Sequence, residues 1–231
     1  MQAENSEDLE SFYIFDERMS TFHSLHPNLE DPSKTYNCPE VPARTKNIHT
    51  YLEKAGLLKH MRELKLGELS SEVIDFLEQE ILPMSHSKEY VQSLKDKCNI
   101  LKDLETLPDR INDVYFSNDS YKGGLLSLLA AIRGVQAILD NSKVKRGYCI
   151  TRPPGHHAKC SDAAGFCLFN NVGMAAKWAK KQGRRVCIFD WDIHHGDGTQ
   201  EEFYEDDEVL FISMHRCDNM SFYPYDKEMA P

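Results

Sequence analysis

The fold is decided by residues 186–200, which read VCIFDWDIHHGDGTQ. The first five are apolar apart from Asp190 and predict a buried strand. The polar residues that follow include a His-His pair and two further aspartates, Asp192 and Asp197. This pattern predicts a loop at the carboxyl end of the strand, which is where parallel sheets bind ligands.

Strand-like segments at 147–151 and 209–214 lie on either side of this strand in the chain. Helices are expected between successive strands, at 172–181 and 200–204. Strands that alternate with helices predict an α/β fold with a mostly parallel sheet and right-handed crossovers.

The amino-terminal half carries weaker patterns. Residues 1–10 are polar and acidic and are expected to be a disordered lead-in to a domain over 11–231. Three prolines and many polar residues predict a loop over 20–40. The remaining elements are expected as strands at 11–15 and 113–116, helices at 43–58, 70–81 with Ser70 or Ser71 as N-cap, and 87–104, and a buried core helix at 120–139.

A second loop has the same character as the first. Residues 152–158, RPPGHHA, follow the strand expected at 147–151 and carry another His-His pair, His156 and His157. Two such pairs with three aspartates, at equivalent places in a parallel sheet, favour one shared site. The alternative is that each loop is a polar turn that only contacts solvent.

Residue types in the two loops fit metal chemistry. Asp192 and His194 are separated by one residue, so their side chains point the same way in an extended segment. Zinc accepts carboxylate and imidazole ligands, and catalytic zinc has three protein ligands and a water. Asp190 and Asp197 are then available to orient histidines, and a histidine near the water can act as general base.

The composition limits the class of protein. The formal net charge is -10, which disfavours direct binding to nucleic acid and favours basic partners. The seven cysteines are scattered and include no CxxC, which fits free thiols in the nucleus or cytoplasm. The acidic start does not resemble a signal peptide, and no membrane helix is expected. The acidic run at 201–208 favours a solvated helix face over a dock for basic substrates.

Motifs along nearly the whole chain resemble the zinc-dependent histone deacetylase family, and its class II branch in particular. They occur in the family's order and read FDERM (15–19), PEVPAR (39–44), SHSKEYV (85–91), RPPGHHA (152–158), GFCLFNNV (165–172), DWDIHHGDGTQ (190–200) and SMHRCDNMSFYP (213–224). The resemblance implies a mostly parallel sheet with helices on both faces, as in arginases and deacetylases. Cys38 departs from the histidine that the family has before Pro-Glu.

The resemblance also implies roles for the loop residues. His157 would be the general base, and His156 an electrostatic or acid partner. Asp190 would support His156, and Asp197 would support His157. The family's zinc ligands correspond to Asp192 and His194.

Two further sites are implied. Gly165, Phe166 and Tyr223 would line the tunnel that holds an acetylated lysine, although Phe166 could equally be a core residue; Tyr223 stands where the family has Phe or Trp. A structural potassium ion would lie at the positions of Asp190, Asp192, His194, Ser213 and Met214.

The implied function is zinc-dependent hydrolysis of N-acetyl-lysine in histone tails or other proteins, with corepressor-type proteins as further partners. The family's third zinc ligand and its carbonyl-polarising tyrosine have no counterpart in the sequence, so we expect a carboxyl-terminally incomplete domain with weak zinc binding and low activity. The alternatives are an inactive acetyl-lysine-binding or regulatory module and an acetylpolyamine amidohydrolase.

Overall fold

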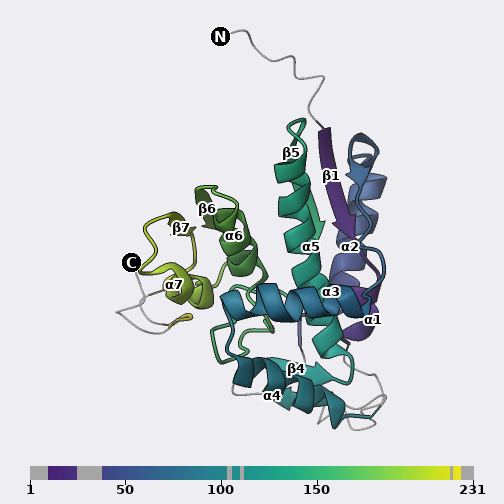
Figure 1. Ribbon diagram of the computed structural model, residues 1–231. Coiled ribbons are helices and arrows are strands. Elements are labelled where there is room, and N and C mark those ends of the chain that lie inside the picture. Colours follow the sequence, from purple (N-terminus) through teal and green to yellow (C-terminus); the bar gives the residue numbers. More distant parts are fainter. Residues whose placement is uncertain (1–9, 25–37, 103–105, 110–111, 219–220, 225–231) are drawn as a thin grey trace.

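The computed structural model describes residues 10–24, 38–102, 106–109, 112–218 and 221–224 (Figure 1). The helices are α1 (Arg18–Phe22), α2 (Ala43–Lys54), α3 (Ser71–Phe76), α4 (Lys88–Asn99), α5 (Ser120–Asp140), α6 (Asn171–Lys181) and α7 (Asp197–Phe203). Single helical turns are η3 (Leu58–His60), η4 (Leu77–Ile81) and η5 (Leu82–Met84). The strands are β1 (Glu10–Phe15), β2 (Arg62–Glu63), β3 (Thr106–Asp109), β4 (Val114–Ser117), β5 (Val144–Ile150), β6 (Val186–Asp190) and β7 (Val209–Ser213).

The first parallel sheet has the order β2-β1-β5 and is covered by helices on both faces. On one face the buried ring of Phe12 lies against α5 and β5, so close that a Cβ on Gly147 would be 2.0 Å from the ring. On the other face, His49 of α2 stacks on Phe15 at 4.2 Å. Figure 1 shows β1 and β5 between these two helices. The predicted α/β class, with a parallel sheet between helices, is confirmed.

The second parallel sheet consists of β6 and β7. Its inner face packs through Ile188 and Val209 against Ala176 of α6 and Phe203 of α7. Phe189 and Ile212 point to the outer face and are exposed. Within the described residues, β5 and β6 are not hydrogen-bonded to each other, so the three strands expected in one sheet belong to two.

Helix α5 forms the centre of the main core. Leu125, Leu126 and Leu128 are fully buried, as predicted for the apolar run over 120–139. This helix is long and apolar enough to cross a membrane by composition alone, but 56 % of its most apolar window is buried inside the protein. Its burial explains its hydropathy, because core helices of globular domains are apolar all round.

Several local predictions are confirmed. Ser70 caps α3 by accepting a hydrogen bond from the N–H of Val73. The expected helix over 87–104 is α4, which ends at Asn99. The helix expected over 43–58 ends earlier, at Lys54, because Gly56 takes a left-handed φ of +70° and stops it.

Other local predictions are wrong. Glu10 opens β1, so it does not belong to a disordered lead-in; residues 1–9 lie outside the described residues. Residues 20–22 belong to α1, not to a loop, and 25–37 lie outside the described residues. The helix expected at 200–204 begins three residues earlier, at Asp197. Strand β4 pairs with β3 in an antiparallel ladder, and β3, which contains Pro108, was not predicted.

Candidate active site

The two His-His loops lie against each other at the carboxyl ends of β5 and β6. A Cβ built on Gly198, at the start of α7, would be 2.5 Å from the carbonyl oxygen of Ala158. The N–H of Thr199 donates to the carbonyl oxygen of His156 at 3.1 Å. Glycine at 198 therefore allows the close approach of the two loops.

Each histidine of the first loop is paired with an aspartate of the second. The Nδ1–H of His156 donates to Asp190 Oδ2 at 2.8 Å, and that of His157 donates to Asp197 Oδ1 at 2.7 Å. The two imidazole rings lie 4.0 Å apart. Both Nε2 atoms are thereby left for chemistry on the other side of the rings.

The two pairs differ electrostatically. Burial disfavours the charged form of both rings, but at His156 the hydrogen bond to Asp190 and the negative charges of the nearby aspartates together outweigh it and raise the pKa. Burial dominates at His157, and the neighbouring His156 adds to it, so the pKa of His157 is lowered. Burial opposes the charge of Asp197, yet the hydrogen bonds that it accepts from His157, Tyr223 and Lys159 together hold the pKa of that carboxyl well below its usual range. At neutral pH His157 is therefore a neutral base beside a carboxylate.

Two further donors reach Asp197. Lys159 Nζ lies 3.1 Å from its Oδ2, and the hydroxyl of Tyr223 donates to the same carboxylate. The ring of Tyr223 packs edge-on against His157 at 5.2 Å. Lys159 was missed by the sequence analysis, although its position two residues after His157 was a usable signal.

Of the expected tunnel residues, Gly165 and Tyr223 lie against the ring of His157, and Phe166 follows Gly165 in the chain. Gly165 has a φ of +49°, and a Cβ there would be 2.2 Å from His157 Cδ2. Phe166 follows with a φ of +67°, which non-glycine residues rarely adopt. The N–H groups of Gly165 and Phe166 donate to the carbonyl oxygens of Asn112 and Asp113, which hold this backbone in place.

The two expected zinc ligands are brought together but remain exposed. Asp192 Oδ1 lies 3.2 Å from His194 Nδ1, with the two side chains 49 % and 43 % exposed. Asp190 accepts the N–H of Asp192 at 3.0 Å, so it orients this loop as well as His156. Among the residues that the structure describes, there is no cluster of three or more metal-ligating side chains.

The expected potassium positions are also neighbours in space. Asp190 and Ser213 are register partners in β6 and β7, and the N–H of Met214 donates to the carbonyl oxygen of Asp190 at 2.8 Å. The hydroxyl of Ser213 lies 2.9 Å from His215 Nδ1.

An aromatic residue that the sequence analysis missed covers His194. Phe222 stacks on this imidazole at 5.0 Å. The guanidinium of Arg216 lies 4.5 Å from the ring of Phe222. In the sequence this phenylalanine directly precedes Tyr223, the residue expected in the tunnel, within the segment SFYP at 221–224.

A buried ion pair supports the first loop from behind. Arg152 has no exposed surface and donates to both carboxylate oxygens of Glu40, at 2.7 and 2.8 Å, and to the hydroxyl of Tyr115 at 2.7 Å. Cys38, two residues before Glu40, is buried and contacts its carbonyl oxygen. The network ties the His-His loop to the residues around position 40.

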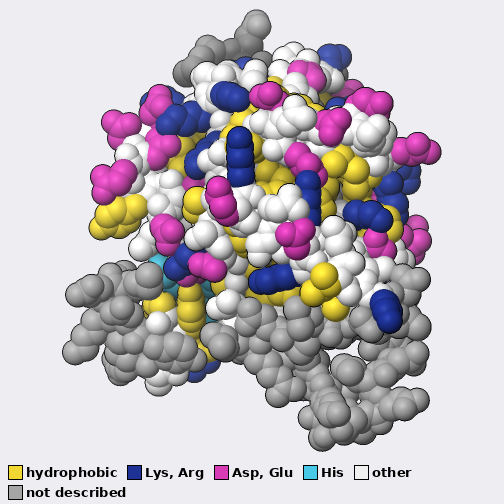
Figure 2. Space-filling view, turned by 60° about the horizontal axis from the view of Figure 1, so that its bottom comes forward, with side chains coloured by type: hydrophobic (Ala, Val, Ile, Leu, Met, Phe, Trp, Pro, Cys, Tyr) yellow, Lys and Arg dark blue, Asp and Glu magenta, His cyan; other side chains and the backbone are white. Residues whose placement is uncertain are grey.

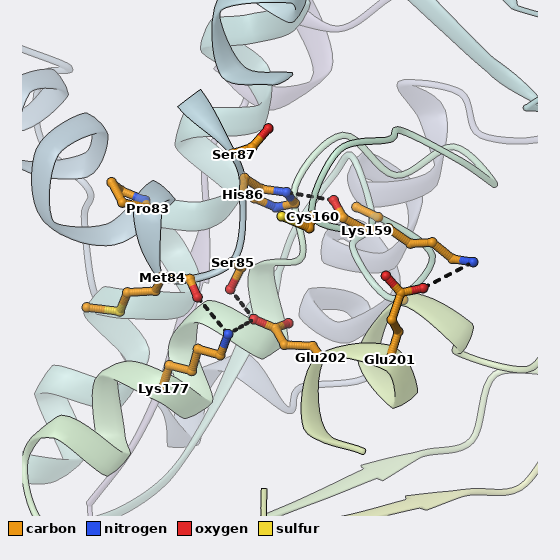
Figure 3. A pocket seen from close by; sticks show the side chains of 12 residues that line it. Pro83, Met84, Ser85, His86, Ser87, Lys159, Cys160, Lys177, Glu201 and Glu202 are labelled. Atoms are coloured by element: carbon orange, nitrogen blue, oxygen red, sulfur yellow. Dashed lines mark hydrogen bonds and ion pairs between the residues drawn. The ribbon is translucent and has the colours of Figure 1, made fainter. Parts of the chain in front are cut away.

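A cavity of about 390 Å³ is lined by Ala158 at the end of the first His-His loop, by the adjacent Lys159 and by Gly198 of α7 (Figure 3). Lys177 and Glu202 pair at 2.8 Å on one side of it, and Lys159 and Glu201 at 3.5 Å on the other. These pairs include two acidic residues of the run over 201–208, and Lys180 pairs with two more, Asp206 and Glu208. In Figure 2, acidic and basic side chains are interspersed and form no single acidic patch on the face shown.

Comparison with known proteins places this arrangement in a family. The histone deacetylase domain family model matches residues 38–230. Histone deacetylase 6 from Caenorhabditis elegans is 35 % identical over 225 residues, which are 95 % of this chain and 22 % of that protein. Polyamine deacetylase HDAC10 from Danio rerio is 37 % identical over 217 residues, 93 % of this chain and 30 % of that protein.

The crystal structure of the HDA15 HD domain matches with a TM-score of 0.78 at 32 % identity and covers 94 % of this chain. This chain corresponds to 57 % of that structure, so it spans only part of its relatives. The fold, the order of the motifs and the family match agree, and the chain belongs to the histone deacetylase family.

Proposed function

We propose that the chain provides the histidine pair and two metal ligands of a deacetylase that hydrolyses the amide of N-acetyl-lysine. The observation that carries the proposal is the pairing of His156 with Asp190 and of His157 with Asp197, with the rings 4.0 Å apart. Family membership supports the reaction class.

In this proposal His157 is the general base. Its lowered pKa keeps the imidazole neutral, and the bond from Nδ1 to Asp197 directs its Nε2 to accept the proton of the attacking water. The water oxygen forms a bond to the acetyl carbon, and the C–N bond of the amide breaks. His156, whose pKa is raised, supplies positive charge and a proton for the leaving amine, which yields lysine and acetate.

Asp192 and His194 would hold the zinc ion. A carboxylate and an imidazole are ligand types that zinc accepts. The ring of His194 lies 6.2 Å from the ring of His157. Bound zinc polarises the acetyl carbonyl and lowers the pKa of its water. Two donors are one fewer than catalytic zinc sites use, which supports weak zinc binding and low activity of this chain by itself. Asp190, Asp192, His194, Ser213 and Met214 remain our proposal for a potassium site.

The substrate we favour is an acetylated lysine of a histone tail or another protein, with its side chain between Gly165, Phe166 and Tyr223. The closeness of Gly165 and Tyr223 to His157 supports a narrow entry at this point. The relatives named as polyamine deacetylases support acetylated polyamines as the second candidate. The exposed two-donor site supports a third, a module that binds acetyl-lysine without hydrolysis.

The experiment incubates the 231-residue chain with zinc and either an acetyl-lysine peptide or an acetylated polyamine, and follows acetate release and binding. We expect slow hydrolysis of the peptide. His157→Asn should abolish it, and His60→Asn, at an exposed position, should leave it unchanged. Faster hydrolysis of the polyamine would instead support the second candidate. Saturable peptide binding with no acetate release would support the module.

A further inference from the structure

The amino-terminal ends of β1, β2 and β5 lie at one end of the first sheet, and Figure 1 shows the starts of β1 and β5 at the top. Because the strands are parallel, this end is opposite to the carboxyl end of β5, where the first His-His loop begins. The segment after α2 leads into β2 here, and the turn after α5 leads into β5. These segments carry six exposed cations, which we call the basic end patch: Lys54, Lys59, Arg62, Lys143, Lys145 and Arg146.

The sheet brings the two halves of the basic end patch together. Arg62 is the register partner of Phe12 in β1. Arg146 is the register partner of Ser11, the preceding residue of β1. Only β1 separates the two arginines, so their backbones lie about two strand spacings, or about 10 Å, apart. An extended segment of about three residues spans this distance.

These cations have few neutralising partners. Among the residues that the structure describes, none of the six pairs with a carboxylate, whereas Lys180 pairs with Asp206 at 2.7 Å and with Glu208 at 2.9 Å. Exposed carboxylates that also lie at this end, and are fewer than the cations, are those of Glu10, Glu53 and Asp140. The basic end patch therefore keeps an excess of positive charge in a chain whose formal net charge is -10.

Two apolar side chains border the basic end patch. Tyr51 is 71 % exposed and Leu57 is 51 % exposed, and they lie on either side of Lys54 in the chain. The N–H of Leu57 donates to the carbonyl oxygen of Leu52 at 3.0 Å, so the turn is fixed to the end of α2. Exposed aromatic and aliphatic groups among cations are typical of surfaces that bind proteins.

We propose that the basic end patch binds an acidic polypeptide segment of a partner protein, with an apolar side chain of that segment packed on Tyr51 and Leu57. Charge complementarity selects this occupant, because attraction between a positive patch and a negative segment steers and orients association. The site with His156 and His157 lies at the other end of the sheet and stays open. The proposal concerns binding and does not depend on deacetylase activity.

The basic end patch consists of charged residues in turns and at strand starts, and not of an apolar sheet face. A further strand that pairs with the free edge of β5 would leave these side chains in solvent, since charged side chains at turns remain exposed. Lys54, Lys59 and Arg62 moreover belong to the β2 side of β1, away from that edge.

Two other occupants are less suitable. A nucleic-acid duplex carries a phosphate charge about every 1.7 Å and extends past the patch, onto a protein of net charge -10. A short acidic segment stays near the patch, within the screening length of about 8 Å at physiological ionic strength. Residues 1–9 of this chain contain Glu4, Glu7 and Asp8 and precede β1 at this end, so they are the second competitor.

The test measures binding of a fluorescent peptide of alternating Glu and Asp with one central Leu to the full 231-residue chain by anisotropy. Lys59→Glu combined with Arg62→Glu is expected to weaken binding at least about 10-fold, since two attractive contacts become repulsive. Lys88→Glu combined with Arg184→Glu makes the same change in net charge at exposed positions outside the patch and should change binding little.

A second pair of variants tests the apolar contact. Tyr51→Ser is expected to weaken binding of the peptide about 5-fold, and to have little effect on a peptide with Gly in place of its Leu. Tyr204→Ser, at a side chain 75 % exposed at the end of α7, is the matched control and should not change binding of either peptide.

Absence of peptide binding at about 0.1 M salt overturns the proposal, and so does an equal loss in both charge-reversed chains. A short DNA duplex that binds more tightly than the peptide, and is lost in the Lys59 and Arg62 variant, would assign the patch to nucleic acid instead. Removal of residues 1–9 that tightens peptide binding more than about 10-fold would assign it to the chain's own acidic segment. If circular dichroism shows that the first charge variant fails to fold, Lys143→Glu combined with Lys145→Glu replaces it and is expected to show the same loss.

Discussion

Gly165 lies directly against the imidazole of His157. A Cβ at this position would be 2.2 Å from Cδ2 of that ring, and the φ of Gly165 is +49°. The backbone here is held by hydrogen bonds to the 112–113 segment, so it cannot move away without breaking them. The absence of a side chain at Gly165 is therefore what allows His157 to reach Asp197.

Gly165→Ala is expected to displace His157 and to destabilise the fold. The left-handed φ costs about 1–2 kcal/mol and the overpacking a further 1–3 kcal/mol. Gly67→Ala is the control, because Gly67 has a φ of +73° and nothing within 4 Å of its Cβ position. Urea unfolding should show a larger loss for the first variant. Equal losses would mean that crowding against His157 is unimportant.

Lys159→Met is expected to raise the pKa of His157. The lysine lies 3.1 Å from Asp197 Oδ2 and neutralises part of the charge that this carboxylate presents to His157. Without it, the protonated imidazole gains a stronger partner. NMR titration of the ring measures the change, and Lys159→Arg, which keeps the charge, should leave the pKa close to that of the unaltered chain. An unchanged pKa in Lys159→Met would contradict this account.

The sequence predicted those elements that are determined by residues close together in the chain. The cap at Ser70, the apolar run of α5 and the two His-His loops each depend on residues within one segment. The contacts that order the site depend on distant residues. Arg152 and Glu40 are 112 positions apart, and neither the periodicity nor the spacing of either segment indicates their pairing.

On the outer face of the β6–β7 sheet, too, the strands could be predicted from the sequence, but the burial of their side chains could not. The apolar segments over 186–190 and 209–214 correctly predicted strands, but apolar residues on both sides of a strand predict burial on both faces. The structure buries Ile188 and exposes Phe189, its neighbour. Periodicity describes which side a residue faces, and only the packing of the whole chain decides what covers that side.

Stability is expected to fall below about pH 6.5, partly through His86. This buried imidazole donates from Nδ1 to the carbonyl oxygen of Lys159 and accepts the N–H of Asn170 at Nε2, so only the neutral ring satisfies both bonds. Burial lowers its pKa from 6.5 to about 4. The unfolded chain binds this proton first, so its contribution is complete above pH 6.5 and decreases by about 3 kcal/mol toward pH 4.

Comparison of unfolding free energies at pH 7 and pH 4.5 measures this effect. His86→Gln should be less stable at pH 7 and should show a smaller difference between the two pH values than the unaltered chain. His23, whose pKa burial also lowers, still contributes a difference in the variant. His60→Gln, at an exposed position, should retain the full difference. A pH dependence in His86→Gln as steep as in the unaltered chain would count against His86.

Glu40→Gln is expected to be among the most destabilising single substitutions in the chain. Arg152 is fully buried and its charge is balanced by the carboxylate of Glu40 at 2.7 and 2.8 Å, so the variant leaves an unpaired buried cation. Loss of one partner of a buried ion pair costs about 3–5 kcal/mol. Glu63→Gln, which removes the partner of the exposed Lys65, should change little.

The pairing itself is tested by changing both partners of the buried pair. Arg152→Met with Glu40→Gln removes both charges, so this double variant should recover much of the stability that Glu40→Gln loses. Chemical unfolding of the three variants gives the coupling energy. Purely additive losses would mean that the two residues act independently, and that the loop with His156 and His157 is held mainly by the backbone bonds around Gly198 and Gly165 instead.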